Sequence, residues 1–193
     1  MLKPVSPEWR ARMDDLNSSD KESQDRAFVA LIELTNKPVA WAYAVWDELL
    51  RLIVEGDNRQ RAIASQLLSN LAKSDPEERI VKDAAALFAL TKDERFVTAR
   101  HCLLSLWKIA IVGARQRKTV VEGLVRRFKE CTAEKNCTLI RYDIQCTLRR
   151  VFDAVPNAQL RSTAEGLIQL EEDPKYRKKY ATVWRSTKAP AIC

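Results

Sequence analysis

Helical periodicity runs through nearly the whole chain, and short polar breaks containing Asp, Asn or Pro interrupt it at regular intervals. In ten successive segments, apolar residues recur at the spacing that places them on one face of an α-helix. The 193 residues include only four glycines, so few positions suit the positive-φ turns that β-hairpins need. We therefore expect an all-α protein of about ten helices.

Several predicted helices begin at recognisable capping residues. Asp75-Pro76-Glu77-Glu78 is typical of a helix start with a capping box, and Asp173-Pro174 repeats the Asp-Pro pair. Pro38 and Pro156 occupy similar first-turn positions. Because the intervening loops are short, consecutive helices should be antiparallel neighbours. The helices are expected over residues 9–17, 20–36, 38–55, 57–73, 76–91, 94–112, 115–133, 137–154, 156–172 and 174–185.

The chain also resembles itself when it is shifted by about 36 to 41 residues. A shift of 36 residues places Asp57 on Asp93 and Leu67-Leu68-Ser69 on Leu103-Leu104-Ser105, and a second correspondence occurs at 41 residues. Two-helix units with such periods are typical of helical solenoids, in which stacked neighbours complete one another's cores. We expect one α-solenoid domain over residues 1–193, with repeats at about 20–55, 57–91, 94–133 and 137–172 and a flexible tail at 186–193.

Residues 93–107 resemble the second helix of a HEAT repeat, in which an Asp caps the helix and a Val and an Arg follow. Here these residues are Asp93, Val97 and Arg100, and a leucine-rich stretch comes after them. The resemblance extends over roughly residues 20–170. It implies a right-handed α-α superhelix of stacked antiparallel helix hairpins, of HEAT or armadillo type. It also implies scaffolding and binding surfaces, and it carries over no catalytic residue.

The cysteines and the apolar segments indicate in which cellular compartment the protein is expected. None of the five cysteines forms a Cys-x-x-Cys pair, so neither a disulfide framework nor a zinc ribbon is expected. Cys102, Cys131 and Cys146 fall on apolar helical patterns, which favours buried thiols in a reducing, cytoplasmic compartment. No apolar run approaches the roughly 20 residues of a membrane span, and the first residues lack a signal-peptide pattern, so no membrane partner is expected.

Enzymatic motifs are lacking in the sequence. His101 is the only histidine, so a His-based catalytic triad has one possible histidine and a multi-histidine metal site has no second one. No phosphate-binding loop, dinucleotide fingerprint or hydrolase elbow occurs. We therefore predict no catalytic residue, metal site or cofactor, and we favour a protein that is not an enzyme.

Charge is distributed unevenly. Residues 1–107 carry a net charge of −2 and residues 108–193 a net charge of +9. Such a basic half suits a phosphate-rich or acidic partner, although each cluster taken singly is also compatible with an ordinary solvated helix face. The predicted basic patch comprises Arg115, Arg117, Lys118, Arg126, Arg127, Lys129, Lys178 and Lys179.

One helix offers a more specific arrangement. In the predicted helix 137–154 the apolar residues share one face, which leaves Arg141, Gln145 and Arg149 as a ridge expected to be exposed. In a HEAT-like stack, Arg100 and Lys108 would join this ridge along a concave groove.

The favoured function is a HEAT-like repeat scaffold that binds a protein or peptide partner, with acidic partners favoured, through this basic groove. The alternative is a nucleic-acid-binding protein, similar in outline to the HEAT-like DNA glycosylases that remove alkylated purines.

Overall fold

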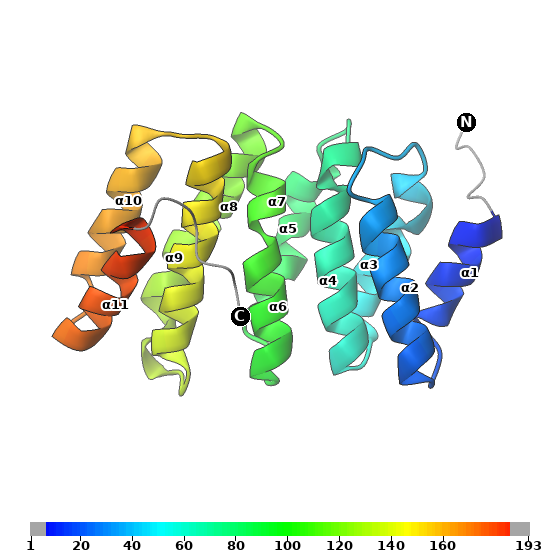
Figure 1. Ribbon diagram of the computed structural model, residues 1–193, viewed down its shortest axis with the longest axis horizontal. Helices are drawn as coiled ribbons and strands as arrows, with labels where there is room; N and C mark the ends of the chain where they lie inside the picture. The colour runs from blue at the N-terminus through cyan, green and yellow to red at the C-terminus, as the bar shows by residue number, and fades with distance from the viewer. Residues whose placement is uncertain (1–6, 186–193) are drawn as a thin grey trace. The chain divides into compact units, whose positions relative to one another are not determined.

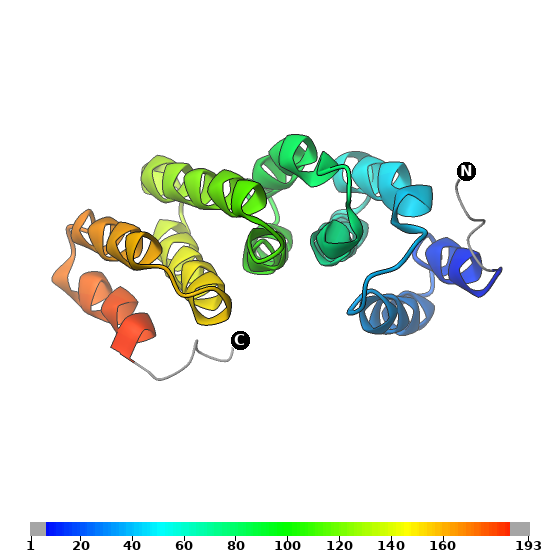
Figure 2. The ribbon, with the colours of Figure 1, turned by 90° about the horizontal axis from the view of Figure 1, so that it is seen from above.

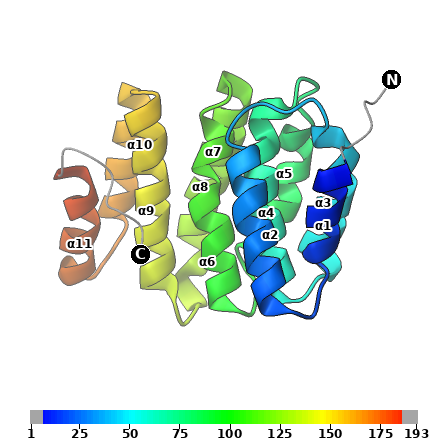
Figure 3. The same ribbon diagram turned by 45° about the vertical axis from the view of Figure 1, so that its right-hand side comes forward.

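The computed structural model describes residues 7–185, and these residues are mostly helical with no β-strand among them. The prediction of an all-α fold is confirmed. The predicted tail at 186–193 and the first six residues lie outside the described residues. The chain divides into two compact units, Met1–Cys102 and Leu103–Cys193, and this boundary falls inside the predicted repeat 94–133. Within each unit, neighbouring helices run nearly parallel or antiparallel to one another (Figures 1 and 3). The superhelical arrangement stays a prediction.

The first unit contains most of the apolar helices. Its core includes the fully buried Trp46, whose indole N–H donates to Asp83 at 2.8 Å. The predicted helix 94–112 is interrupted at Leu106 and forms two helices, α6 (Phe96–Ser105) and α7 (Trp107–Ala110). The boundary between the two units falls within α6. The elements are α1 (Pro7–Asp15), α2 (Lys21–Leu34), α3 (Ala42–Glu55), α4 (Asn58–Leu71), the 3₁₀ turn η1 (Ala72–Ser74), α5 (Arg79–Leu90) and α6 (Phe96–Ser105).

The second unit has two layers: α8 and α10 lie on one side, and α9 and α11 lie on the other (Figure 2). Its core includes Phe128, Leu148 and Tyr180, all fully buried. The elements are α7 (Trp107–Ala110), α8 (Ala114–Glu130), the 3₁₀ turn η2 (Cys131–Ala133), α9 (Cys137–Ala154), α10 (Ala158–Gln169) and α11 (Pro174–Arg185).

The predicted caps are confirmed in part. Asp173 accepts a hydrogen bond from the backbone of Lys175, and α11 begins at Pro174 as predicted. Asp75 is a cap as well, but it accepts from the backbone N–H groups of Arg79 and Ile80. The helix therefore begins three residues later than predicted, and the expected capping box at 75–78 was wrong.

Candidate functional site

A groove of about 330 Å³ lies between α8 and α10 in the second unit. The two helices run in the same direction, so their first turns meet at one end of the unit (Figure 1). Apolar side chains and the stems of two basic residues form most of its surface, and polar side chains of α10 complete it. The lining residues are Ala114, Arg117, Lys118, Val121, Asn157, Gln159, Leu160 and Thr163.

The electrostatics of this groove favour an anionic group. Lys118 is exposed, with only a 4.0 Å contact to Glu122, and Arg117 is partly buried. The Nε atom of Arg117 is buried and has no hydrogen-bond partner among the described residues. The first turns of two helices add the positive ends of their dipoles at the same place. A carboxylate in the groove would therefore meet the positive charges of Arg117 and Lys118.

Sequence reasoning found the basic side of this groove and missed the other side. Arg117 and Lys118 belong to the predicted basic patch, whereas Asn157, Gln159 and Thr163 carry no charge and follow a predicted loop. No motif in the sequence marks a groove between α8 and α10, and its lining comes from two helices that α9 separates along the chain.

The predicted exposed ridge on α9 is not exposed, and that prediction was wrong. Gln145 is 0% exposed and Arg149 is 6% exposed. Gln145 donates to the carbonyl of Ala164 on α10 and accepts from the indole of Trp184 on α11. The guanidinium of Arg149 donates to Asp153 and to the carbonyl of Val183. The ridge therefore holds α10 and α11 against α9.

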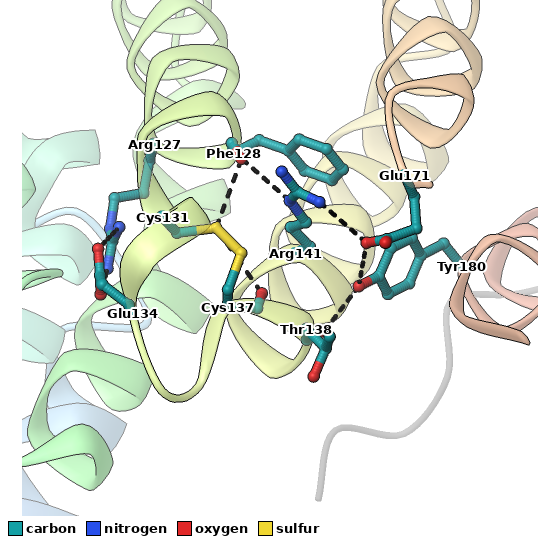
Figure 4. The surroundings of a disulfide bond; sticks show 9 residues. All are labelled: Arg127, Phe128, Cys131, Glu134, Cys137, Thr138, Arg141, Glu171 and Tyr180. Carbon is teal, nitrogen blue, oxygen red and sulfur yellow. Dashed lines mark hydrogen bonds and ion pairs between the residues drawn. A yellow bond between two sulfur atoms is a disulfide. The ribbon is translucent and has the colours of Figure 1, made fainter. Parts of the chain in front are cut away.

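Arg141, the third member of the ridge, is mostly buried, with a side chain 11% exposed, and it forms an ion pair (Figure 4). It donates through Nη1 to Glu171 at 3.0 Å and through Nε to the carbonyl of Phe128 at 3.2 Å. Its guanidinium also lies 4.8 Å from the centre of the Phe128 ring. The hydroxyl of Tyr180 lies 3.1 Å from the same carboxylate. These groups form a buried network that links α8, α9 and α11.

This network shifts the pKa values of its members. Burial raises the pKa of Glu171, but hydrogen bonds from Arg141, from the backbone of Asp173 and from Tyr180 outweigh it, so the net pKa is lowered. Burial, together with the neighbouring carboxylate, raises the pKa of Tyr180. Glu171 is therefore held as a carboxylate, which satisfies Arg141 from inside the protein and leaves this arginine unavailable to an external ligand.

The remaining predicted groove residues fall in different units. Arg100 lies on α6 in the first unit and Lys108 on α7 in the second, and both are partly buried. The predicted convergence of Arg100 and Lys108 with the α9 ridge along one concave groove stays a prediction.

Most residues of the predicted basic patch are exposed, but the prediction was wrong for Arg127. Arg127 is 2% exposed and forms a two-point ion pair with Glu134, with distances of 2.5 and 2.7 Å. It therefore closes the turn after α8 rather than facing solvent. The exposed members of the patch are Arg115, Lys118, Arg126 and Lys129 on α8, and Lys178 and Lys179 on α11.

Helix α11 presents a second basic surface. Its twelve residues contain no acidic side chain, and Lys175, Lys178 and Lys179 are exposed along it. The ammonium of Lys179 lies 4.8 Å from the centre of the Tyr142 ring, and that of Lys175 lies 5.6 Å from the centre of the Tyr176 ring. The surface therefore combines positive charge with aromatic rings.

The cysteines differ from the prediction in one respect. Cys102 and Cys146 are buried thiols as expected, and burial raises the pKa of Cys102 to about 12, which leaves it unreactive. Cys131, predicted to be a thiol, instead forms a disulfide with Cys137. The prediction relied on Cys-x-x-Cys spacing, whereas this pair is six residues apart across a turn.

Residues 7–185 contain neither a metal-binding cluster nor a helix that could span a membrane. No group of three or more His, Cys, Asp or Glu side chains in this part of the chain is arranged to hold a metal ion. Within the same range, no helix combines the length and apolar character that a bilayer crossing requires.

Comparisons with known proteins identify no family. No family model matches the chain, and no curated protein matches it. Two solved structures, both described as engineered proteins, share 19% and 17% sequence identity with it, each with a TM-score of 0.47. They match 90% and 91% of this chain, which spans 46% of the first structure and 94% of the second.

Proposed function

We propose that this protein is a HEAT-like helical scaffold that binds an acidic segment of a protein partner in the groove between α8 and α10. The observation that carries the proposal is the composition of this groove. Its apolar lining lies beside Arg117 and Lys118, and the buried Nε of Arg117 lacks a partner among the described residues. Such a surface fits a peptide that carries carboxylates next to an aliphatic side chain.

The contacts of α9 favour a binding groove elsewhere in the second unit. Arg141 and Arg149 are held by Glu171 and Asp153, so they contribute to the second unit's packing instead of to a ligand. Arg117 has no such acidic partner among the described residues, and the acidic neighbour of Lys118 is itself exposed. A partner carboxylate can therefore bind both cations without breaking a buried ion pair.

Peptide selection tests this proposal. A phage-displayed library of random peptides is selected on the wild-type protein and, separately, on the Arg117→Glu, Lys118→Glu double variant. We expect the wild type to enrich sequences with Asp or Glu beside Leu, Ile or Val. The best peptide should lose at least about tenfold in affinity for the double variant, measured by fluorescence anisotropy.

A matched control uses Arg126→Glu with Lys129→Glu, which makes the same charge change on the same helix outside the groove lining. This variant should keep its affinity within about threefold, because long-range charge alone contributes little at physiological salt. Equal losses in the two double variants, or enrichment of peptides without acidic residues, would contradict the proposal.

Nucleic-acid binding is the second candidate, and the surface of α11 favours it. A stripe of lysines with interleaved tyrosines suits a phosphate backbone with bases stacked beside it. The apolar face of α11 is already buried through Tyr180, Val183 and Trp184, which disfavours insertion of this helix into a bilayer.

Salt dependence tests this second candidate. If Lys175, Lys178, Lys179 and Arg185 each neutralise one phosphate, the affinity for a duplex DNA should fall about 100-fold between 50 and 200 mM salt. Replacing the three lysines with Gln should reduce this salt dependence by roughly three-quarters. A fall of less than threefold, or an unchanged dependence in the triple variant, would exclude α11 as a nucleic-acid surface.

A further inference from the structure

We propose that Cys131 and Cys137 form a reversible redox site, which changes between a disulfide and two thiols by exchange with a small thiol such as glutathione. Cys131 begins η2 directly after α8, and Cys137 is the first residue of α9. Their Cα atoms are 5.1 Å apart, within the range that disulfides require. The bond therefore crosses the turn that joins α8 to α9 (Figure 4).

The same turn is closed by a second, independent interaction. Arg127 precedes Cys131 and Glu134 follows it, and their two-point ion pair spans the turn from the other side. The backbone N–H of Glu134 also donates to the carbonyl of Cys131 at 2.8 Å. Because these contacts do not involve sulfur, the turn keeps its conformation when the disulfide opens.

The structure also accommodates a thiol at Cys131. Its sulfur lies 3.4 Å from the carbonyl oxygen of Phe128 and 3.8 Å from that of Cys137. A disulfide sulfur has no hydrogen to donate, whereas a thiol at this position donates to one of these carbonyls without movement of the backbone. Both oxidation states are therefore compatible with the same fold.

Exposure decides which sulfur reacts. Cys131 is 0% exposed, whereas Cys137 is partly exposed. A thiolate of glutathione attacks the sulfur of Cys137, the S–S bond breaks, and Cys131 leaves as a thiolate that takes a proton from water. A second glutathione then attacks the mixed disulfide, which releases the Cys137 thiolate and glutathione disulfide. The protein gains two electrons and two protons, and two glutathione molecules are oxidised.

The sequence allows a direct measurement of this bond. Trypsin cuts after Lys129, Lys135 and Arg141, so Cys131 and Cys137 fall in separate peptides, 130–135 and 136–141. The native, full-length protein is equilibrated in mixtures of reduced and oxidised glutathione, its free thiols are alkylated, and the digest is analysed by mass spectrometry. The disulfide appears as these two peptides joined, and the thiols appear as two alkylated peptides.

We expect the ratio of joined to alkylated peptides to fall tenfold for each tenfold rise in [GSH]²/[GSSG], and to recover on reoxidation. The oxidised protein should melt about 5 °C above the reduced protein, because a closed loop of this length restricts the unfolded chain. This difference should vanish in Cys137→Ala and persist in Cys146→Ala, a control at a buried cysteine outside the disulfide.

Three results would overturn the proposal. The first is that the two peptides stay unjoined in oxidised glutathione. The second is that they stay joined when the native protein is held in excess reduced glutathione. The third is that Cys131 or Cys137 joins a different cysteine-containing peptide. The peptide measurement uses the wild-type chain, so it decides the matter even if Cys137→Ala fails to fold.

Discussion

Replacing Arg141 should destabilise the second unit. The substitution Arg141→Met keeps most of the side-chain volume and removes the cation that faces Glu171, whose side chain is only 7% exposed. Removing one partner of a buried ion pair costs about 3–5 kcal/mol, because the other charge stays buried. Glu171 keeps two donors, the hydroxyl of Tyr180 and the backbone N–H of Asp173. We therefore expect a loss near the lower end of this range, about 3 kcal/mol.

A double-mutant cycle isolates the ion pair from the loss of packing. Glu171→Leu alone leaves Arg141 without its carboxylate partner and should cost a similar free energy of unfolding. Arg141→Met with Glu171→Leu replaces both charges and should cost about 1–2 kcal/mol, far less than the sum of the single changes. The coupling between the two residues should therefore exceed about 2 kcal/mol.

Hydrogen exchange is the suitable assay, because the chain has two compact units and a whole-chain unfolding signal would mix them. The slowest amides of α9 and α11 should exchange about 150-fold faster in Arg141→Met, the factor that corresponds to 3 kcal/mol. The amides of α3 provide an internal comparison. A change below about fivefold in α9 and α11, or additive single effects, would refute the assignment of Arg141 as a buried structural residue.

Three further predictions address single features. Because the pKa of Glu171 is lowered below its ordinary value of 4.5, its stabilising contribution is present above that pH and lost as the pH falls through the lowered pKa; acid titration of unfolding should show a shallower fall in Glu171→Gln. Gly166→Ala should stabilise the second unit by about 0.5–1 kcal/mol, measured by hydrogen exchange of the α10 amides, since Gly166 lies within α10 and an added Cβ meets no atom within 4 Å. Asp75→Ala should cost about 1–2 kcal/mol, measured by hydrogen exchange of the α5 amides, because it removes the acceptor for the first N–H groups of α5.

The sequence by itself predicted where most helices lie. Capping residues such as Asp57 and Asp173 accept hydrogen bonds from N–H groups a few positions away. Their effect is local, so the sequence predicts these helix starts. Glu78 is the exception: it adopts a left-handed conformation (φ 53°), which delays α5 until Arg79. Trp46 is fully buried because it belongs to a helix that is apolar on nearly all sides.

The candidate site depended more on long-range contacts. Periodicity placed Arg141, Gln145 and Arg149 together on one face of a helix, and that placement is correct. It assigned this face to solvent, because nothing in the sequence of the helix shows that α11 packs over it. The groove between α8 and α10 was not predicted either, since its two sides come from helices that are not consecutive.

The division between the two kinds of information follows from distance along the chain. Helix boundaries, apolar faces and charge clusters arise from residues within a few turns of one another, and the sequence determined them. Tertiary packing alone decided which polar face is covered and which arginines are paired. A polar helix face has the same periodicity whether it meets water or another helix, so only the folded chain distinguishes a binding surface from a buried ion pair.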